Sequence, residues 1–245
     1  MALDTARPTV LITGAGAGIG SELVPFFAGT GHNVILVGSQ KPVLEGIAAA
    51  ARYVFRANTT VIACDLAEPD GAHALATELS RRRIDVDILV NNAGFGTYGE
   101  SEATGPRTEE RIVQANVVAL TVLTKLLLPA MIARGSGRIL NVASTSALAP
   151  VPMHSVYGAA KAYVLAFSET LAEELMGTGV MVTSLSPDPT ETESSVSAES
   201  GSKWNDEERV MSARSVARTG FRALIRGDRV AVPNFGSLAT ARLIA

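Results

Sequence analysis

Short runs of apolar residues alternate with longer stretches of helical periodicity up to about residue 185. The short runs are rich in Val, Ile and Leu and lack polar alternation, which is typical of parallel strands covered on both faces. The predicted strands are Thr9–Thr13, Asn33–Val37, Thr60–Ala63, Val86–Val90, Arg138–Val142 and Val180–Leu185. The predicted helices lie near residues 18–29, 42–55, 69–82, 107–133 and 157–176.

This alternation predicts an α/β fold in which right-handed βαβ crossovers build a doubly wound, parallel, Rossmann-type sheet. No repeat or linker divides the chain, so we expect residues 1–245 to form a single domain. Residues 187–210 interrupt the pattern, because they are rich in Ser and Glu and predict no core helix. A long irregular segment in a compact domain is usually a lid or binding loop. We therefore predict a flexible substrate loop there, followed by a helix near 212–226 and a short strand near 229–232.

Composition narrows the class of protein. Charged residues make up 18% of the chain, below the roughly 25% of typical soluble proteins, which predicts a large core or a subunit interface. The net charge of −3 offers no broad attraction for nucleic acids or anionic membranes. The longest apolar run, Val117 to Met131, contains Lys125 and Pro129 and is shorter than a membrane span. The single cysteine and the lack of a signal-peptide pattern fit a reducing compartment. We expect a cytoplasmic protein that binds neither nucleic acid nor membranes.

A glycine-rich turn follows the first strand, with the sequence Thr13-Gly14-Ala15-Gly16-Ala17-Gly18-Ile19-Gly20. Glycines permit a sharp turn and let a pyrophosphate approach the N–H groups at a helix N-terminus. The spacing fits T-G-x-x-x-G-x-G and not G-x-G-x-x-G, because Ile19 occupies the sixth position. A purely structural turn is the alternative, but its place between a strand and a helix favours cofactor binding.

The end of the second strand bears on which nicotinamide cofactor binds. An acidic residue about 20 positions after the glycine turn usually holds a ribose 2′-hydroxyl, whereas a basic group holds a 2′-phosphate. Here the strand leads into Ser39-Gln40-Lys41, and the first acid is Glu45. Ser39 and Lys41 could bind a 2′-phosphate, although the usual arginine is missing. The sequence therefore favours NADP(H) over NAD(H).

Tyr157 and Lys161 have a Y-x-x-x-K spacing, which places both side chains on one face of a helix. A free tyrosine has a pKa near 10, which is poor for proton transfer at neutral pH. A cation at about 4–5 Å, in an effective dielectric near 20, would stabilise the phenolate by roughly 4 kcal/mol. The pair is therefore a candidate acid/base group.

Further polar residues lie at the predicted carboxyl edge of the sheet, where α/β folds bind ligands. Ser144 follows a buried strand and could hydrogen-bond a substrate carbonyl, with Ser146 as the neighbouring alternative. Asn116 lies in an apolar helix, where a buried amide needs a polar partner. His154 could be a second proton donor, but a residue at a helix entrance is the favoured interpretation. No HExxH or similar cluster predicts a metal site.

Together these residues resemble the short-chain dehydrogenase/reductase family in its short, single-domain form. The matching motifs, in order over about residues 8–235, are Thr13–Gly20, Asp65, Asn91–Gly94, Asn116, Ser144, Tyr157, Lys161 and the segment from Pro187 to Thr192. The resemblance implies an NAD(P)-dependent oxidoreductase that interconverts a small carbonyl compound and a secondary alcohol. It also implies a homodimer or homotetramer that assembles through the helices holding Asn116 and Tyr157.

The resemblance also implies roles for individual residues. Tyr157 exchanges a proton with the substrate, and Lys161 lowers the tyrosine pKa and holds the nicotinamide ribose. Ser144 positions the carbonyl, and Asn116 holds a water that links Lys161 to solvent. The residues expected to bind the cofactor are Gly14, Gly18, Ile19, Gly20, Ser39, Asp65, Leu66, Asn92, Ala93, Gly94, Tyr157, Lys161, Thr190 and Thr192.

One position departs from the family pattern, which has Pro-Gly where this chain has Pro187-Asp188. Unless it turns outward, Asp188 adds bulk and negative charge near the cofactor phosphates. The aromatic and apolar residues Phe95, Tyr98, Met153 and Trp204 favour an apolar or aromatic ketone as substrate, although each could equally be packing.

Two other functions remain as alternatives. A dinucleotide-binding regulatory protein of the same fold, with little or no turnover, is disfavoured by the intact set of Ser144, Tyr157 and Lys161. An S-adenosylmethionine-dependent methyltransferase shares glycine-rich turns but has no use for Tyr157 and Lys161. The sequence favours an NADPH-dependent reductase.

Overall fold

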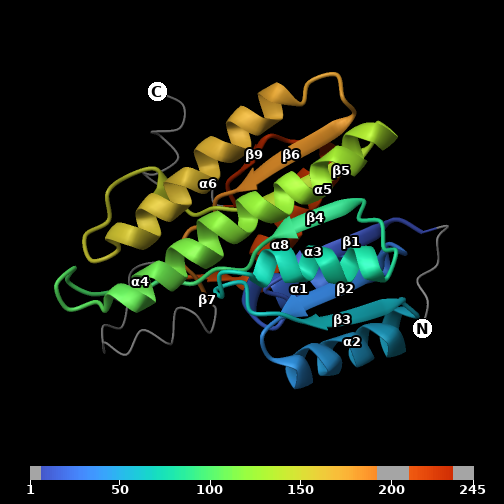
Figure 1. Ribbon diagram of the computed structural model, residues 1–245, viewed down its shortest axis with the longest axis horizontal. Coiled ribbons are helices and arrows are strands. Elements are labelled where there is room, and N and C mark those ends of the chain that lie inside the picture. The colour runs from blue at the N-terminus through green and yellow to red at the C-terminus, as the bar shows by residue number, and fades with distance from the viewer. Residues whose placement is uncertain (1–6, 192–209, 234–245) are drawn as a thin grey trace.

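A computed structural model describes residues 7–191 and 210–233, which build one parallel sheet between two layers of helices (Figure 1). The strand order is β3-β2-β1-β4-β5-β6-β9. The strands are β1 (Thr9–Thr13), β2 (Asn33–Gly38), β3 (Thr59–Ala63), β4 (Ile88–Asn91), β5 (Gly137–Val142), β6 (Val180–Leu185) and β9 (Val230–Ala231). The chain builds outward from β1 to β3 and then crosses back to β4, so the strand order reverses between β1 and β4. Open α/β sheets bind ligands at this reversal, outside the carboxyl ends of the strands.

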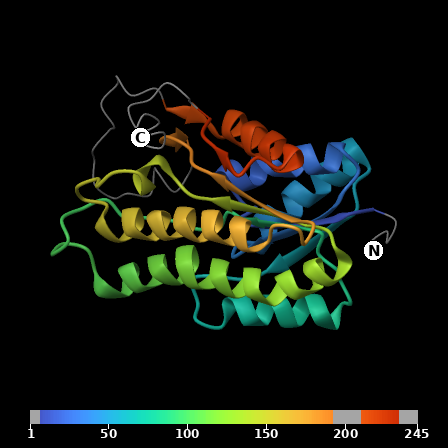
Figure 2. The ribbon, with the colours of Figure 1, turned by 90° about the horizontal axis from the view of Figure 1, so that it is seen from above.

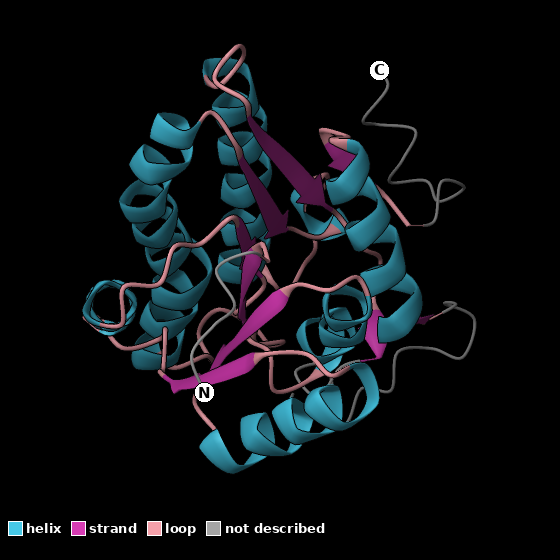
Figure 3. Cartoon of the chain, turned by 90° about the vertical axis from the view of Figure 1, so that its right-hand side faces the viewer, coloured by secondary structure: helices cyan, strands magenta, loops and turns pink. Residues whose placement is uncertain are grey.

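The helices cover both faces of the sheet, so the predicted doubly wound fold is confirmed (Figure 2). One layer contains α1 (Gly18–Gly29), α2 (Lys41–Phe55) and α8 (Ala213–Arg226). The other contains α3 (Gly71–Arg81), α4 (Pro106–Val113), α5 (Leu120–Arg134) and α6 (Ser155–Glu174). Viewed along the sheet, successive strands fan out with the usual twist of parallel sheets (Figure 3).

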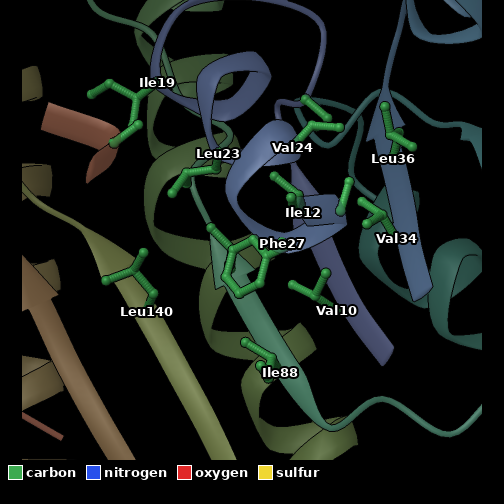
Figure 4. Close-up of a cluster of buried hydrophobic side chains, with 14 of the residues drawn as sticks. Val10, Ile12, Ile19, Leu23, Val24, Phe27, Val34, Leu36, Ile88 and Leu140 are labelled. Carbon is green, nitrogen blue, oxygen red and sulfur yellow. The ribbon is translucent and has the colours of Figure 1, made fainter. Parts of the chain in front are cut away.

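The core on the α1 side fixes the direction of that helix. Phe27 and Leu23 of α1 are fully buried and contact the apolar side chains of β1, β4 and β5 (Figure 4). Burying a side chain of this size stabilises the fold by about 1.5–3 kcal/mol. The packing holds the N-terminus of α1 against the glycine turn after β1.

The predicted helix 107–133 forms, but it contains a wider turn that the sequence did not predict. The chain is helical from Pro106 to Arg134, with a π-helical segment at Gln114–Ala119 that contains the buried Asn116. Such turns occur frequently at functional sites. Pro129 does not end this helix. By length and composition alone the helix could cross a membrane, whereas we expected an apolar run too short to do so. Buried helices of soluble proteins share this property, and this one packs against β5 and α3.

A buried polar network ties the two central helices of this layer to the sheet. Asn91 of β4 and Asn141 of β5 are paired in register, and their side-chain amides are 2.9 Å apart. Asn91 also donates to Thr124 of α5 at 3.1 Å, and Asn141 donates to Ser168 of α6 at 2.9 Å. Because buried polar groups are costly unless they are paired, this network fixes how α5 and α6 lie on the sheet.

Only part of the predicted substrate loop 187–210 can be compared with the structure. Two short strands, β7 (Thr190–Glu191) and β8 (Met211–Ser212), pair in parallel at its ends, and neither was predicted. Thr192 and Trp204 lie outside the described residues.

Candidate active site

Most of the predicted site residues gather at the carboxyl ends of β1, β4, β5 and β6. The glycine turn follows β1, Asn92 follows β4 and Ser144 follows β5. The segment after β6 is attached to this edge, since Thr145 N–H donates to Pro187 O at 3.0 Å. Helix α6 places Tyr157 in its first turn, beside the same edge.

The glycine turn has the geometry of a phosphate cradle. Gly14 and Gly18 have left-handed φ values of +64° and +53°, which glycine adopts without strain. A Cβ on Gly20 would lie 2.1 Å from Gly14 O and 2.5 Å from Asn92 Nδ2, so α1 packs directly on the turn. Ala17, which precedes α1, provides no side-chain cap. The first N–H groups of α1 can therefore bind a phosphate, and these residues fit a dinucleotide.

Thr13 and Asn92 lock this turn to the end of β4. The Asn92 side-chain amide donates to Thr13 O at 3.0 Å and to Gly14 O at 3.2 Å. The Thr13 hydroxyl accepts from the N–H groups of Asn92 and Ala93, each at 3.0 Å, and donates to Val90 O. The Asn92 side chain therefore positions the phosphate cradle.

Of three other residues predicted to bind the cofactor, two have buried side chains and one has an exposed side chain. The side chains of Ile19 and Leu66 are buried in the core on opposite faces of the sheet. Only their backbone atoms are therefore suitably placed for a cofactor. Ser39 is exposed at the end of β2, where it is accessible to a ribose or a 2′-phosphate.

Asp65 is held in place by a residue that the sequence analysis missed. Its carboxylate accepts from Ala67 N–H at 2.9 Å and from the Arg111 guanidinium at 2.8 Å. Arg111, on α4, also pairs with Glu68. No local pattern links Arg111 to Asp65, because the two residues meet only where α4 approaches the loop after β3.

The structure brings the Ser144 side chain next to the Tyr157 hydroxyl, close enough to lower the pKa of the phenol. The Ser144 hydroxyl also accepts from Ser146 N–H at 3.1 Å and thereby caps the short helical turn Thr145–Ala147. The Ser144 side chain therefore caps this turn and also lies next to Tyr157, while its predicted role toward a substrate carbonyl stays a prediction. Ser146, the alternative, lies one hydrogen bond further away, with its hydroxyl 3.2 Å from that of Ser144.

Lys161 lies behind the tyrosine, yet the pKa of Tyr157 is raised overall and not lowered. Its ammonium is buried, donates to Val142 O at 2.8 Å, and lies 5.6 Å from the centre of the Tyr157 ring. Burial raises the pKa of Tyr157 above its usual value, and the neighbouring Ser144 only partly opposes this. A nearby cation favours the phenolate, whereas the loss of water around the phenol disfavours it. The loss of water is the larger effect on the pKa of Tyr157 here.

Lys161→Met should change how stability depends on pH. Burial lowers the pKa of Lys161 from its usual 10.5 to about 8. Between these values the unfolded chain holds a proton that the folded protein has released, so stability rises with pH. The wild-type unfolding free energy, relative to Lys161→Met, should therefore increase by about 2–3 kcal/mol between pH 8 and pH 10. Urea unfolding of both proteins at the two pH values measures this, and a constant difference would contradict the assignment.

Asn116 carries an unsatisfied acceptor inside the protein. Its side-chain N–H groups donate to Phe95 O and Ile112 O, both at 2.9 Å. Its side-chain oxygen is buried and has no hydrogen-bond partner among the described residues. Leaving such an atom unpaired costs about 1–3 kcal/mol, which marks it as an acceptor for a bound water or ligand. The predicted water-holding role stays a prediction.

His154 contributes to an aromatic wall beside the tyrosine. Its ring meets Tyr98 edge-on at 5.0 Å and lies 5.7 Å from the Tyr157 ring. Burial lowers the pKa of His154, although its bond to the Thr97 backbone opposes this, so the imidazole is neutral near pH 7. The residue directly precedes α6, as the helix-entrance interpretation predicts, and it also lines the site.

Beyond the site, the whole chain has recognisable relatives. The family model for short chain dehydrogenase matches residues 8–203. The very-long-chain 3-oxoacyl-CoA reductase of Homo sapiens is 33% identical over 181 residues, 72% of this chain and 57% of the human protein. This chain therefore spans less than two thirds of that relative's length.

Two solved structures agree over nearly the full length. The short-chain dehydrogenase from Sphingobium yanoikuyae in complex with NADPH has a TM-score of 0.88 and 32% identity, with 97% of this chain and 92% of that chain covered. The bulky-bulky ketone specific alcohol dehydrogenase from Comamonas testosteroni has a TM-score of 0.86 and 29% identity, with coverage of 98% and 91%. The match to the family model includes the glycine turn, Ser144, Tyr157 and Lys161. The chain belongs to the short-chain dehydrogenase family.

Proposed function

We propose that the protein is an oxidoreductase that transfers hydride between NADPH and a carbonyl compound, forming a secondary alcohol. The observation that carries this proposal is the Tyr157 hydroxyl, which lies next to the Ser144 side chain and in front of Lys161, near a phosphate cradle. A purely regulatory nucleotide-binding protein has no need of such a proton donor. The family membership of the chain supports the same reaction class.

The chain's own residues supply the proton and the orientation. The bound dinucleotide supplies the hydride. Ser144 and Tyr157 offer two neighbouring hydroxyls to one carbonyl oxygen, and Tyr157 donates the proton that completes the alcohol. The raised pKa of Tyr157 keeps the phenol protonated at neutral pH, which favours reduction. After the transfer, the Lys161 cation stabilises the phenolate.

Several features of the cofactor site support NADPH over NADH. Ser39 is exposed after β2, Lys41 begins α2, and the first acid after this strand is Glu45. No carboxylate at the strand end therefore repels a 2′-phosphate. The Sphingobium relative was solved with NADPH. Fluorescence titration should give a lower dissociation constant for NADPH than for NADH.

The wall beside Tyr157 supports an apolar or aromatic ketone as substrate. Tyr98 and a neutral His154 place two rings next to the proton donor. The Comamonas relative is a bulky-bulky ketone specific alcohol dehydrogenase. Flat apolar groups would pack on these rings, whereas an anionic substrate would find no cation in this wall.

A carbonyl panel tests the proposed function. NADPH oxidation is followed at 340 nm with aromatic ketones, aliphatic ketones and anionic keto acids, and S-adenosylmethionine binding is measured in parallel. We expect turnover with NADPH and the highest kcat/KM for the aromatic ketones. NADPH binding without turnover on any carbonyl would favour the regulatory alternative, and tight S-adenosylmethionine binding would favour a methyltransferase.

Asp188→Asn and Asp188→Gly should both tighten NADPH binding. Asp188 is half-exposed near the site, and its backbone oxygen accepts from the Thr190 hydroxyl at 2.8 Å. Removing a partly screened like charge is worth about 0.2–1 kcal/mol, so we expect a gain of up to about fivefold. The Asn variant separates charge from bulk, because it keeps the size of the side chain. An unchanged dissociation constant in both variants would show that Asp188 turns away from the phosphates.

We further propose that residues 1–245 act as one domain in a cytoplasmic homodimer or homotetramer that does not enter membranes. Support comes from an apolar groove of about 440 Å³ between α4 and α6, in which Val113, Val156 and Ala159 lie. Val118 of the π-helical segment and Tyr163 of α6 are partly exposed. Light scattering after gel filtration should give the mass of two or four chains.

A further inference from the structure

Gly96 lies directly against the ring of Tyr157. A Cβ at this position would lie 2.6 Å from Tyr157 Cδ2 and 2.7 Å from Cγ, whereas ordinary contacts lie at 3.4–4 Å. Gly96 is not among the residues with positive φ, so its backbone conformation does not itself require glycine. The contact with the ring is therefore what excludes a side chain here.

The segment that contains Gly96 is anchored on both sides. Phe95 O accepts from the Asn116 amide at 2.9 Å, and the Thr97 hydroxyl donates to Glu109 at 3.1 Å. Gly99 N–H donates to Met153 O at 3.0 Å. The segment can retreat from Tyr157 only by weakening these bonds, so a methyl group at position 96 would displace the ring instead.

The ring has little freedom in other directions. The Ser144 side chain lies next to its hydroxyl, and the centre of the His154 ring lies 5.7 Å from that of Tyr157. A displaced ring would carry the hydroxyl away from Ser144 and from the carbonyl oxygen that both would contact. Misplacement of a reacting group by about 1 Å can cost roughly 100-fold in rate.

We propose that Gly96 is a positioning residue, whose bare backbone sets where the acid/base tyrosine lies. This inference rests on the proposed function of Tyr157. Gly94, two residues earlier, shows the same relation to Asn116, because a Cβ there would lie 2.3 Å from the Asn116 side-chain oxygen. The segment 94–96 thus lies against both side chains and sets the position of each.

Kinetics of Gly96→Ala test the proposal, with Gly99→Ala as the matched control. A Cβ on Gly99 would meet only Thr104 Cγ2, at 3.4 Å, so this variant should keep wild-type kcat. Gly96→Ala should lower kcat by about 10- to 100-fold while the NADPH dissociation constant stays within about twofold. Wild-type kcat in Gly96→Ala would overturn the proposal.

A thermal unfolding cycle tests the contact independently of catalysis. Gly96→Ala should lower Tm in the wild-type background, but not in a Tyr157→Ala background, where the ring no longer occupies the space. An equal loss of Tm in both backgrounds would overturn the proposal, because the glycine would then accommodate something other than the ring. This cycle remains informative even if Tyr157 has no role in turnover, which the Tyr157→Phe variant decides separately.

Discussion

Tyr157→Phe should lower kcat for ketone reduction by about 10²- to 10⁴-fold, the usual contribution of a positioned acid or base. The variant removes the hydroxyl that donates the proton and leaves the neighbouring Ser144 in place. It keeps the ring that packs on Gly96 and lies beside His154, so the site should retain its shape. The NADPH dissociation constant should stay within about twofold, since the phosphate cradle is unaffected.

Tyr163→Phe is the matched control on the same helix. The Tyr163 hydroxyl lies 2.8 Å from the Thr121 hydroxyl and faces away from the site, on the partly exposed side of α6. Its loss should leave kcat close to that of the wild type. Substantial turnover in Tyr157→Phe, measured beside this control, would refute the assigned proton-donor role.

Gly20→Ala should weaken NADPH binding by about 100-fold or more. The added methyl would lie 2.1 Å from Gly14 O and 2.5 Å from the Asn92 amide, so the turn that presents the helix N–H groups must move. Loss of two hydrogen bonds to a charged phosphate costs about 3–6 kcal/mol, which corresponds to at least this change in affinity. Overpacking also costs about 1–3 kcal/mol in stability. Fluorescence titration with NADPH and thermal unfolding measure the two effects.

Gly16→Ala is the control for Gly20→Ala, because it adds a methyl group to the same turn without creating a close contact. A Cβ on Gly16 would lie 3.8 Å from Leu44, which is an ordinary contact. Its Tm and its dissociation constant for NADPH should therefore match the wild type. If Gly20→Ala bound NADPH as tightly as Gly16→Ala, the glycine turn would not be the phosphate site.

Hydrophobic patterning predicted the sheet, because each buried strand is a short run of apolar residues that can be recognised on its own. The π-helical turn at Asn116 was not predictable, since an extra residue in one turn leaves an apolar helix looking regular. The polar residue inside that helix was the only local sign of it. The four-residue spacing placed Tyr157 and Lys161 on one face of a helix. It did not indicate how deeply each side chain is buried, and burial is the main cause of the pKa shift of both.

Residues that act through distant partners were the hardest to find. Arg111 meets Asp65 only because the fold brings α4 to the loop after β3. In the sequence, Gly96 looks like an ordinary loop glycine, and its contact with Tyr157 exists only in the folded chain. The sequence could therefore identify the reacting groups, but not the residues that hold them in place.

Transfer of a deuterium label tests the central claim most directly. The protein is incubated with NADPH deuterated at the transferable C4 position and an aromatic ketone, and the product is analysed by mass spectrometry. We predict an alcohol with one deuterium on the carbinol carbon, formed by the wild type and lost in Tyr157→Phe. NADPH binding with no labelled alcohol from any ketone of the panel would contradict the account.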